Sequence, residues 1–263
     1  MKPMAIDLFC GLGGWTEGLL AEGYDVTGYD IEAHEYGEER YPAKLVLQDV
    51  LTLHGAQFKD AALIVASPPC QEYSYMAMPW SRAKAKAAAI RADATGEALK
   101  RLTALFYACF RIQREAIEAA GRHIPMVVEN VKGAQPWVGR AAWNFGSYYL
   151  WGDVPALMPQ RAALKNPGFR FDGSGRSFQS ESVARHVEGM KNETGGSWFK
   201  IGSPGQTVTG VNPDGRLWQR DPVASCSSGS RKRAHASAKI AKIPFALSSW
   251  IARTYKPSEG LGL

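Results

Sequence analysis

Short apolar runs alternate with helix-like segments through the first 130 residues, and this alternation constrains the fold more than any other feature. The strand-like runs are residues 4–9, 24–30, 44–50, 62–67 and 124–130. Helical patterns are predicted at residues 14–23, 32–41 and 96–121, and Gly121 is a typical helix C-cap residue. The alternation predicts an α/β fold, with a mostly parallel sheet covered by helices on both faces.

The composition changes after about residue 150. Residues 151–235 are rich in Gly, Ser, Pro, Asn and Asp, which is typical of turns, short strands and loops, so we expect a small irregular lobe there. A helical pattern returns within residues 236–263 and is expected to begin near Pro244, because proline suits the first turn of a helix. The chain is therefore divided into residues 1–150, 151–235 and 236–263.

Composition and charge exclude few functions here. No apolar run reaches eighteen residues, so no membrane span is expected. The first strand follows Met1 almost at once, without the pattern of a signal peptide, and a cytoplasmic location in a bacterium or a phage-infected cell is predicted. The net charge of +6 is compatible with a nucleic-acid partner but is not specific for one.

Of the four cysteines, one stands in an unusual position. Cys10, Cys109 and Cys226 are interpreted as two small buried hydrophobes and a loop residue without a role. No Cys-x-x-Cys pair or zinc-type spacing occurs, so no metal site is predicted. Cys70 follows a buried strand and two prolines, which stiffen the loop at the carboxyl end of that strand. Ligands bind at this edge in open α/β sheets, so the position suits a nucleophile.

The segment "DLFCGLGGW" joins the first strand to the first helix through a glycine turn. Its glycines let a ligand approach the backbone, although the spacing is not that of the usual dinucleotide fingerprint. Asp30 ends the second strand and suits ribose hydroxyls, and Asp49 ends the third and is a candidate acceptor for an adenine amino group. A role as a helix N-cap is an open alternative for either aspartate.

The segment "VVEN" places Glu129 and Asn130 at the end of another apolar strand, on the same sheet edge as Cys70. Burial at a strand end is expected to raise the pKa of Glu129 by desolvation. A protonated carboxyl group there could relieve the charge that forms on a ring nitrogen when a thiolate attacks the ring. The alternative for Glu129 is a surface residue that caps the next element.

Taken together, these motifs resemble the cytosine-C5 DNA methyltransferases, in their compact phage or bacterial form. The resemblance lies in "DLFCGLGGW" at 7–15, "SPPCQEYS" at 67–74 and "VVENV" at 127–131, and more weakly in "IAKIPFALSSWIA" at 240–252. It implies a Rossmann-like S-adenosylmethionine-dependent methyltransferase fold. It also implies a DNA target-recognition lobe at 151–235 and a C-terminal helix that returns to the catalytic domain.

The resemblance implies a mechanism and a set of site residues. The Cys70 thiolate would add to C6 of a cytosine flipped out of double-stranded DNA, Glu129 would contact N3 and the exocyclic amine, and Asn130 would hold the loop. The C5 atom would then take the methyl group from S-adenosylmethionine, without a metal. The implied cofactor residues are Phe9, Gly11, Gly13, Asp30, Ile31, Asp49 and Pro69. The implied substrate residues are Gln71, Ser74, Arg82 and Lys84, with Lys86 and Arg91 as further phosphate contacts.

The sequence departs from the family pattern at two places. The Gln-x-Arg-x-Arg motif that follows the Glu motif is absent, and Arg140 is our candidate for its role, with Arg161 as a second. The last motif lacks its usual Gly-Asn-Ser, which leaves the contacts of Leu247 and Ser248 with the cofactor open.

Several alternatives stay open from the sequence. The substrate could be RNA rather than DNA. The chain could also be a non-catalytic DNA-binding relative: the missing arginines are the only support for this alternative, and the intact Cys70, Glu129 and Asn130 argue against it. The basic segment at 82–91 is either a phosphate contact or a solvated helix. Trp198 and Trp218 are interpreted as core residues of the small lobe. That lobe is short, which predicts a target of roughly 2–4 base pairs. A monomer is sufficient for the mechanism, and a restriction partner is neither indicated nor excluded.

Overall fold

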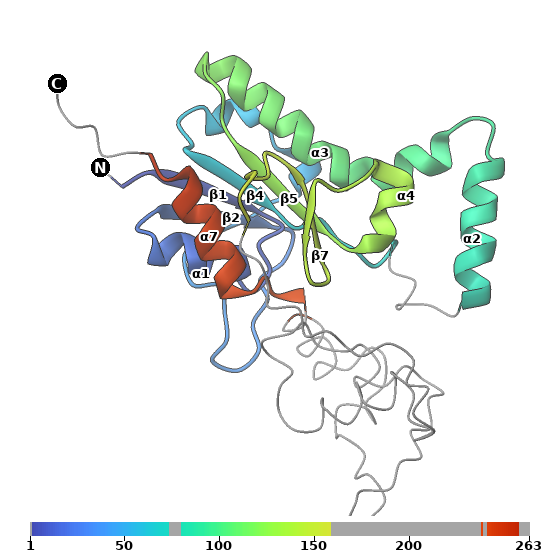
Figure 1. Cartoon of the computed structure of the whole chain (residues 1–263), viewed down its shortest axis with the longest axis horizontal. Coiled ribbons are helices and arrows are strands. Elements are labelled where there is room, and N and C mark those ends of the chain that lie inside the picture. The colour runs from blue at the N-terminus through green and yellow to red at the C-terminus, as the bar shows by residue number, and fades with distance from the viewer. Residues whose placement is uncertain (1, 74–79, 159–237, 239–240, 258–263) are drawn as a thin grey trace, which may run out of the picture. The chain divides into compact units, whose positions relative to one another are not determined.

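The computed structural model describes residues 2–73, 80–158, 238 and 241–257, with the side chains of Trp80 and Arg82 left out (Figure 1). The chain divides into two units, and residues 1–160 with 242–263 make up the first. The lobe predicted at residues 151–235 lies outside the described residues, apart from its first eight positions. The account that follows concerns the first unit.

A seven-stranded sheet in the order β3-β2-β1-β4-β5-β7-β6 forms the centre of this unit (Figure 1). Its strands are β1 (Met4–Leu8), β2 (Asp25–Asp30), β3 (Lys44–Leu47), β4 (Leu63–Ala66), β5 (Met126–Asn130), β6 (Trp143–Phe145) and β7 (Tyr148–Gly152). The first five strands pair in parallel, whereas β7 is antiparallel to both β5 and β6. The strand order reverses between β1 and β4, where doubly wound sheets bind their ligands.

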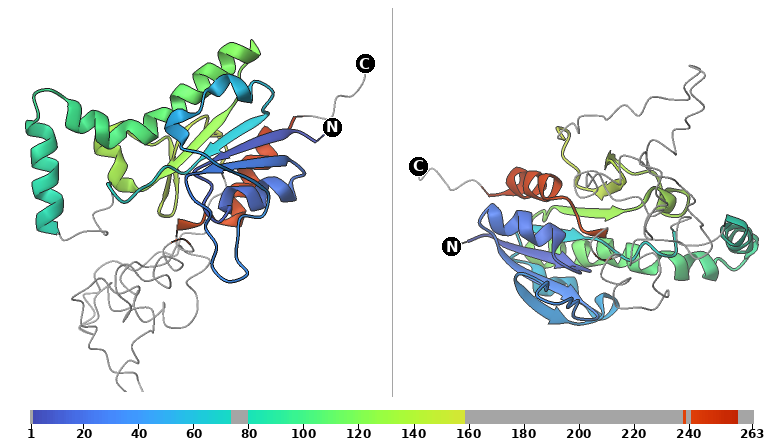
Figure 2. Two further views of the ribbon diagram at one scale, coloured as in Figure 1. Left: turned by 180° about the vertical axis from the view of Figure 1, so that it is seen from behind. Right: turned by 90° about the horizontal axis from the view of Figure 1, so that it is seen from below.

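Helices cover both faces of the sheet (Figure 2). The α-helices are α1 (Gly14–Ala21), α2 (Trp80–Ala92), α3 (Glu97–Ala120), α4 (Gln135–Val138) and α7 (Phe245–Tyr255). The 3₁₀ turns are η1 (Val50–Thr52), η2 (Gly55–Phe58) and η4 (Lys132–Ala134). Helix α3 packs on one face with η1 and η2, and α1 packs with α7 on the other. The predicted α/β class is thereby confirmed.

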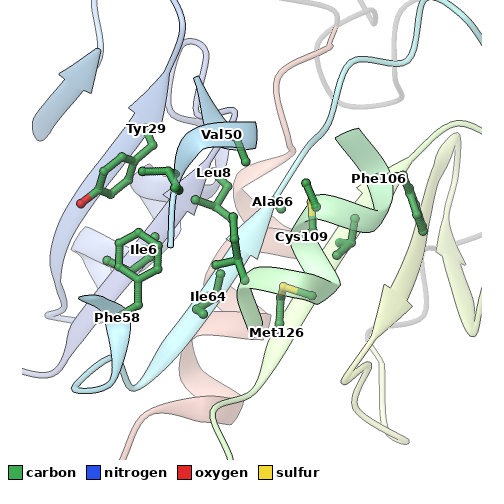
Figure 3. Close-up of a cluster of buried hydrophobic side chains, with 14 of the residues drawn as sticks. Ile6, Leu8, Tyr29, Val50, Phe58, Ile64, Ala66, Phe106, Cys109 and Met126 are labelled. Atoms are coloured by element: carbon green, nitrogen blue, oxygen red, sulfur yellow. The ribbon is translucent and has the colours of Figure 1, made fainter. Parts of the chain in front are cut away.

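The central strands β1, β4 and β5 are mostly apolar because the middle of the sheet is buried on both sides. On one face, Ile6, Leu8 and Ile64 pack with Phe58 and α3 residues such as Phe106 and Cys109 (Figure 3). On the other face, Ala5, Leu63 and Val65 pack with Trp15 and Leu19 of α1 and with Ile251 of α7. Cys10 and Cys109 are both buried, as the sequence predicts.

Two local predictions are corrected by the structure. Residues 32–41 are not helical but form an irregular loop that contains a single bridge between Tyr36 and Glu39. Gly37 in this loop has φ 66°, a left-handed conformation that no α-helix contains. The hairpin of β6 and β7 was also absent from the sequence prediction, because its strands are short and its aromatic residues follow no clear alternation.

Helix α7 packs along α1, although the two are far apart in sequence (Figure 1). The helices approach closely at Gly18, where an added Cβ would lie 2.4 Å from the backbone of Ser248. Ion pairs join Glu22 to Arg253 at 2.6 Å and Glu17 to Lys242 at 2.5 Å. None of the helices that the structure describes is long and apolar enough to cross a membrane.

Candidate active site

The glycine turn between β1 and α1 has an unusual backbone. Phe9, Gly11 and Gly13 have φ values of 57°, 50° and 77°. A positive φ strains the backbone of a residue that has a side chain, and Phe9 is such a residue. A Cβ on Gly11 would meet nothing within 4 Å, whereas one on Gly13 would lie 2.5 Å from Cδ of Pro42. The backbone at Gly11 therefore faces open space at the sheet edge, where a ligand can approach it.

Asp30 fastens the glycine turn to the end of β2. Its Oδ2 accepts the Gly11 N–H at 2.9 Å, and its Oδ1 accepts the N–H of Ile31 at 2.8 Å and that of Glu32 at 3.4 Å. Burial acts to raise the pKa of Asp30, but the hydrogen bonds from His34 and from these backbone groups outweigh it and lower the pKa. Asp30 is therefore an ionised carboxylate at neutral pH. Ile31 beside it is 73% exposed, an uncommon degree for an isoleucine.

Asp49 acts as the N-cap of η1. Its Oδ1 accepts the N–H of Leu51 at 2.9 Å, which is the cap geometry that the sequence left open as an alternative. Asp30 and Asp49 stand at the ends of neighbouring parallel strands, because Asp30 pairs with Leu47 in the β2–β3 register. The sheet thus brings the two aspartates to one edge, as expected.

Three hydrogen bonds fix the loop that carries Cys70. The Asn130 side-chain amide donates to the carbonyl of Pro68 at 2.9 Å in a buried contact, which ties the loop to the end of β5. The Tyr73 hydroxyl donates to the carbonyl of Leu102 on α3 at 2.9 Å. The N–H of Ser67 donates to the carbonyl of Leu8 at 3.1 Å. With two prolines in the same stretch, the loop presents Cys70 in a defined position.

Cys70 and Glu129 lie at the same end of β4 and β5, as the sequence predicts, and each has a raised pKa. Burial raises the pKa of Glu129 to about 8, although the neighbouring Ser67 hydroxyl opposes the shift. Burial raises the pKa of the Cys70 thiol to about 11, and the charge of an ionised Glu129 adds to the effect. At neutral pH the pair therefore consists of a carboxylic acid beside a thiol, and the cysteine is not ionised in advance.

Trp15 and Ser67 also belong to this site, although the sequence analysis gave them no role. The indole N–H of Trp15, in the first turn of α1, donates to the Ser67 hydroxyl oxygen at 3.0 Å. Ser67 follows Ala66 of β4, and Ala66 pairs with Val128, the residue before Glu129, so the serine lies next to Glu129 at the strand ends. The only signal in the sequence is position, since Trp15 follows the glycine motif directly and Ser67 precedes the prolines.

A second buried carboxyl group lies under the glycine turn. The Thr16 hydroxyl donates to Asp7 Oδ2 at 2.7 Å and is 2.6 Å from the Tyr41 hydroxyl, while Asp7 Oδ1 has no partner among the described residues. Burial raises the pKa of Asp7 to about 8, so this group is also protonated at neutral pH. The Tyr41 ring fills the space over Gly28, where an added Cβ would lie 2.3 Å from the ring.

The other predicted site residues are placed less specifically. Pro69 and Gln71 are exposed on the cysteine loop, and Arg140 is exposed between α4 and β6, without a hydrogen bond or ion pair to any described residue. Leu247 and Ser248 are buried in α7. The following predicted residues lie outside the described residues or have side chains that do: Ser74, Arg82, Arg161, Trp198, Trp218 and Cys226.

The basic residues of α2 have partners close to the cysteine loop. Lys86 forms an ion pair with Glu72, and the Arg91 guanidinium lies over the ring of Trp137 at 5.1 Å. Lys84 is exposed on the same helix. Across the described ranges, no group of three or more His, Cys, Asp or Glu side chains is placed to hold a metal ion.

The fold and site define a Rossmann-like protein with a glycine turn beside an ionised aspartate and a cysteine beside a buried glutamic acid. The family model of the C-5 cytosine-specific DNA methylases matches residues 4–134, which include all of these groups. The chain belongs to this family through that region, and the resemblance and the Rossmann-like methyltransferase fold predicted from the sequence are confirmed.

Three solved structures show partial likeness to the chain. A DNA modification methyltransferase encoded within an E. coli prophage is 24% identical, with a TM-score of 0.31 over 51% of this chain and 33% of that one. The S. pombe Dnmt2 methyltransferase is 15% identical, with a TM-score of 0.33 over 53% and 37%. The Entamoeba histolytica methyltransferase EhMeth is 16% identical, with a TM-score of 0.31 over 53% and 41%.

The chain therefore aligns with only about a third to two fifths of the length of these proteins. All three TM-scores are below 0.5, so the assignment to the family rests on the family model and the motifs. None of the curated proteins matches the chain.

Proposed function

We propose that the chain is an S-adenosylmethionine-dependent methyltransferase that acts on C5 of a flipped-out cytosine in double-stranded DNA. The observation that carries this proposal is the pairing of Cys70 with a buried, protonated Glu129 at one edge of the sheet. Family membership supports the same chemistry. Cytosine must leave the duplex because the stacked bases hide the ring face that a thiolate attacks.

Cys70 and Glu129 take complementary parts in the proposed reaction. The Cys70 thiol loses its proton to water, the sulfur forms a bond to C6 of the cytosine, and the electron pair of the C5–C6 bond is delocalised toward N3. Glu129 donates its proton to N3 and so neutralises that charge. After C5 has been methylated, its proton goes to water, the sulfur leaves C6 as thiolate, and N3 returns its proton to Glu129. The nucleophile and the acid are both regenerated.

The raised pKa values bear on how the reaction would begin. A thiol with a pKa of about 11 is nearly all protonated at neutral pH, so attack requires removal of its proton. A protonated Glu129 favours that removal, because only the ionised carboxylate repels a neighbouring thiolate. Binding of N3 to Glu129 would hold the carboxyl group in its protonated form and keep this repulsion absent. We infer that the cysteine becomes reactive only with a base in place.

The glycine turn fits S-adenosylmethionine. The open space at Gly11 admits a ligand against the backbone, the ionised Asp30 can accept from ribose hydroxyls, and the exposed Ile31 offers an apolar surface for the adenine. Asp49 can accept from the adenine amino group beside its cap contact, and Phe9, Gly13 and Pro69 would complete the pocket. When bound, the cofactor would supply an electrophilic methyl group.

The basic residues of α2 suit the phosphates of the DNA. Lys84 is exposed there, and Lys86 and Arg91 stand on the same helix. Such contacts position a duplex without reading its sequence. Gln71, Ser74 and Arg82 are proposed to contact the substrate, Arg140 to replace the missing arginines of the family, and the lobe at residues 151–235 to read the target.

Nucleoside mass spectrometry of DNA and RNA from cells that express the full chain tests this proposal. We expect 5-methylcytosine to rise in DNA with the wild-type protein and to stay at background with Cys70→Ala. Cys109→Ala is the matched control, because it removes a thiol that is buried in the core on α3.

Each other outcome has a definite meaning. A rise in RNA alone would replace DNA by RNA as the substrate. A rise that persists with Cys70→Ala would refute the covalent mechanism. If neither nucleic acid changes while the protein is folded and binds S-adenosylmethionine, the chain is a non-catalytic relative and the proposal is wrong.

A further inference from the structure

We infer that Ser67 is a positioning residue for Glu129 and that Trp15 fixes the direction of its hydroxyl group. The inference concerns a chain of contacts from the first turn of α1 to the carboxyl group of β5. The arrangement of Trp15, Ser67 and Glu129 does not depend on the proposed function, whereas its consequence for the reaction rests on that function.

The register of the sheet places the two side chains next to each other. Ala66 of β4 pairs with Val128 of β5 in parallel, so the residues that follow them, Ser67 and Glu129, are neighbours at the strand ends. Side chains alternate between the faces of a sheet. Val65 and Val127, two positions earlier, lie on the face covered by α1, so Ser67 and Glu129 point to the side from which Trp15 comes.

The hydrogen-bonding capacity of the three groups determines the direction of each bond. An indole N–H can only donate, so the Ser67 oxygen accepts from Trp15 at 3.0 Å. The serine keeps one O–H, and that proton is free to point at the Glu129 carboxyl group. Trp15 is 2% exposed and packed in the core, so its N–H is a fixed reference for the hydroxyl. Ser67 therefore supplies a directed donor to the ionised form of Glu129.

Few other groups influence Glu129. Across β7 its register partner is Leu150, which has no charge, and Cys70 on the β4 side is the titratable neighbour whose own pKa responds to Glu129. Besides burial, the Ser67 hydroxyl is the described group that shifts the pKa of Glu129, and it lowers that pKa. The serine thus limits how strongly burial favours the protonated acid.

For the proposed reaction this contact has a specific use. Glu129 must give up a proton when the sulfur adds to the base and take it back when the product forms. Without the Ser67 donor, the ionised state would be buried with no compensating hydrogen bond, and proton release would become less favourable. Because Trp15 belongs to the first turn after the glycine motif, the orientation of the acid also depends on the position of that helix end.

A direct titration of Glu129 tests the inference without relying on activity. The full chain is labelled with ¹³C at the glutamate carboxyl carbons, Glu129→Gln assigns the signal, and its pKa is followed by NMR. We expect Ser67→Ala to raise the pKa by about one unit, the low end for a hydrogen bond to a charged group. Trp15→Phe should raise it by less, and Ser67→Thr, which keeps the hydroxyl, should leave it near the wild-type value.

The inference fails if Ser67→Ala leaves the pKa unchanged or lowers it, or if Ser67→Thr raises it as much as Ser67→Ala does. Should Ser67→Ala not fold, Trp15→Phe decides, because it removes the N–H donor and keeps most of the aromatic bulk. The basic limb of the methylation rate against pH should move in parallel with the NMR value, while the affinity for S-adenosylmethionine stays constant. A chain without methylation activity would still give the titration, so the two proposals fail separately.

Discussion

Asp30 and Glu129 occupy equivalent places, at the carboxyl ends of parallel strands, and yet their pKa values move in opposite directions. The exposure of the two residues is nearly the same, 8% and 9%. Asp30 accepts three backbone N–H groups and contacts His34, and its pKa is lowered. No backbone N–H of the described residues donates to the Glu129 carboxyl group, only the neighbouring Ser67 hydroxyl opposes the effect of burial, and the pKa of Glu129 is raised to about 8. The number of donors, and not burial alone, decides which carboxyl group is charged.

This difference matches the tasks proposed for the two residues. Asp30 holds the glycine turn to β2, so its charge is part of the structure and is already satisfied by the backbone. Glu129 holds a proton near neutral pH and can exchange it with a substrate. One sheet edge therefore combines a permanent anion with a proton donor. The anion belongs to the half of the site that contains the glycine turn and Asp30, and the proton donor belongs to the half that contains Cys70 and Glu129. Substitutions in the two halves should have different consequences.

The largest expected effect is that of Glu129→Gln on methylation. The amide keeps the shape and the neutral state but cannot transfer its proton, so the rate should fall by about 10²–10⁴-fold. Binding of S-adenosylmethionine, measured by calorimetry, should remain within about twofold because the cofactor site is in the other half. A variant that keeps more than a tenth of the wild-type rate would show that Glu129 is not the acid.

The second effect concerns the pH dependence of stability. A carboxyl group whose pKa rises from 4.5 to about 8 on folding binds more protons in the folded state, so its contribution to stability is lost as pH rises through this window. Between pH 5.5 and 8.5, Glu129→Gln should reduce the loss in the free energy of unfolding by roughly 2–4 kcal/mol. Asp7 also has a raised pKa, so Asp7→Asn should reduce the loss in the same direction.

Urea denaturation at the two pH values gives this difference. Asp30 provides the contrast, since its lowered pKa stabilises the protein above the unfolded value of 3.8 and loses that contribution only in acid. If the free energy of unfolding falls equally in wild type and Glu129→Gln between the two pH values, the pKa of Glu129 is not raised and the comparison with Asp30 fails.

Asp30→Ala is expected to act through the half of the site that contains the glycine turn, and so to change stability and cofactor affinity. Removal of an anion that accepts from Gly11, Ile31 and Glu32 should lower the free energy of unfolding by about 2–3 kcal/mol and the affinity for S-adenosylmethionine by about 10–100-fold. Asp25→Ala is the matched control, because Asp25 begins the same strand with an exposed side chain. If Asp30→Ala binds the cofactor as tightly as this control, Asp30 is only structural.

The smallest expected effects are those of alanine substitutions at two glycines of the same turn, Gly11 and Gly13, and they should differ from each other. Gly11→Ala adds a methyl group in open space, so we expect a cost in stability of about 1 kcal/mol from its positive φ and a clear loss of cofactor affinity. Gly13→Ala has the same kind of strain and also a contact of 2.5 Å with Pro42, so its stability should fall further. Thermal unfolding with and without cofactor measures both. A Gly11→Ala protein with unchanged affinity would place the ligand elsewhere.

The sequence was sufficient to predict the first five strands along the chain and the edge of the sheet at which the site lies. Apolar runs bounded by Gly, Pro and Asp mark the strands, and parallel pairing then brings Cys70 and Glu129 together without further information. Burial of Glu129 could also be anticipated, because its strand is apolar up to that position.

Other features depend on contacts that no local pattern records. The hydrogen bond from Trp15 to Ser67 joins residues 52 positions apart, and the Thr16–Tyr41 contact joins residues 25 apart. Residues 32–41 resemble a helix in composition, but Gly37 has a left-handed φ and Tyr41 is buried over Gly28, so the segment forms an irregular loop. The ionised state of Asp30 likewise depends on backbone groups that fold around it.

The pairing of α1 with α7 has a consequence for synthesis of the protein on the ribosome. The contact between Glu22 and Arg253 spans 231 positions, so the apolar side of α1 leaves the exit tunnel long before the helix that covers it. Until then Trp15 and Leu19 have no covering helix, and the nascent chain would present a site for chaperones. Burial of the apolar side of α1, the helix that follows the glycine turn, thus waits until α7 has been translated.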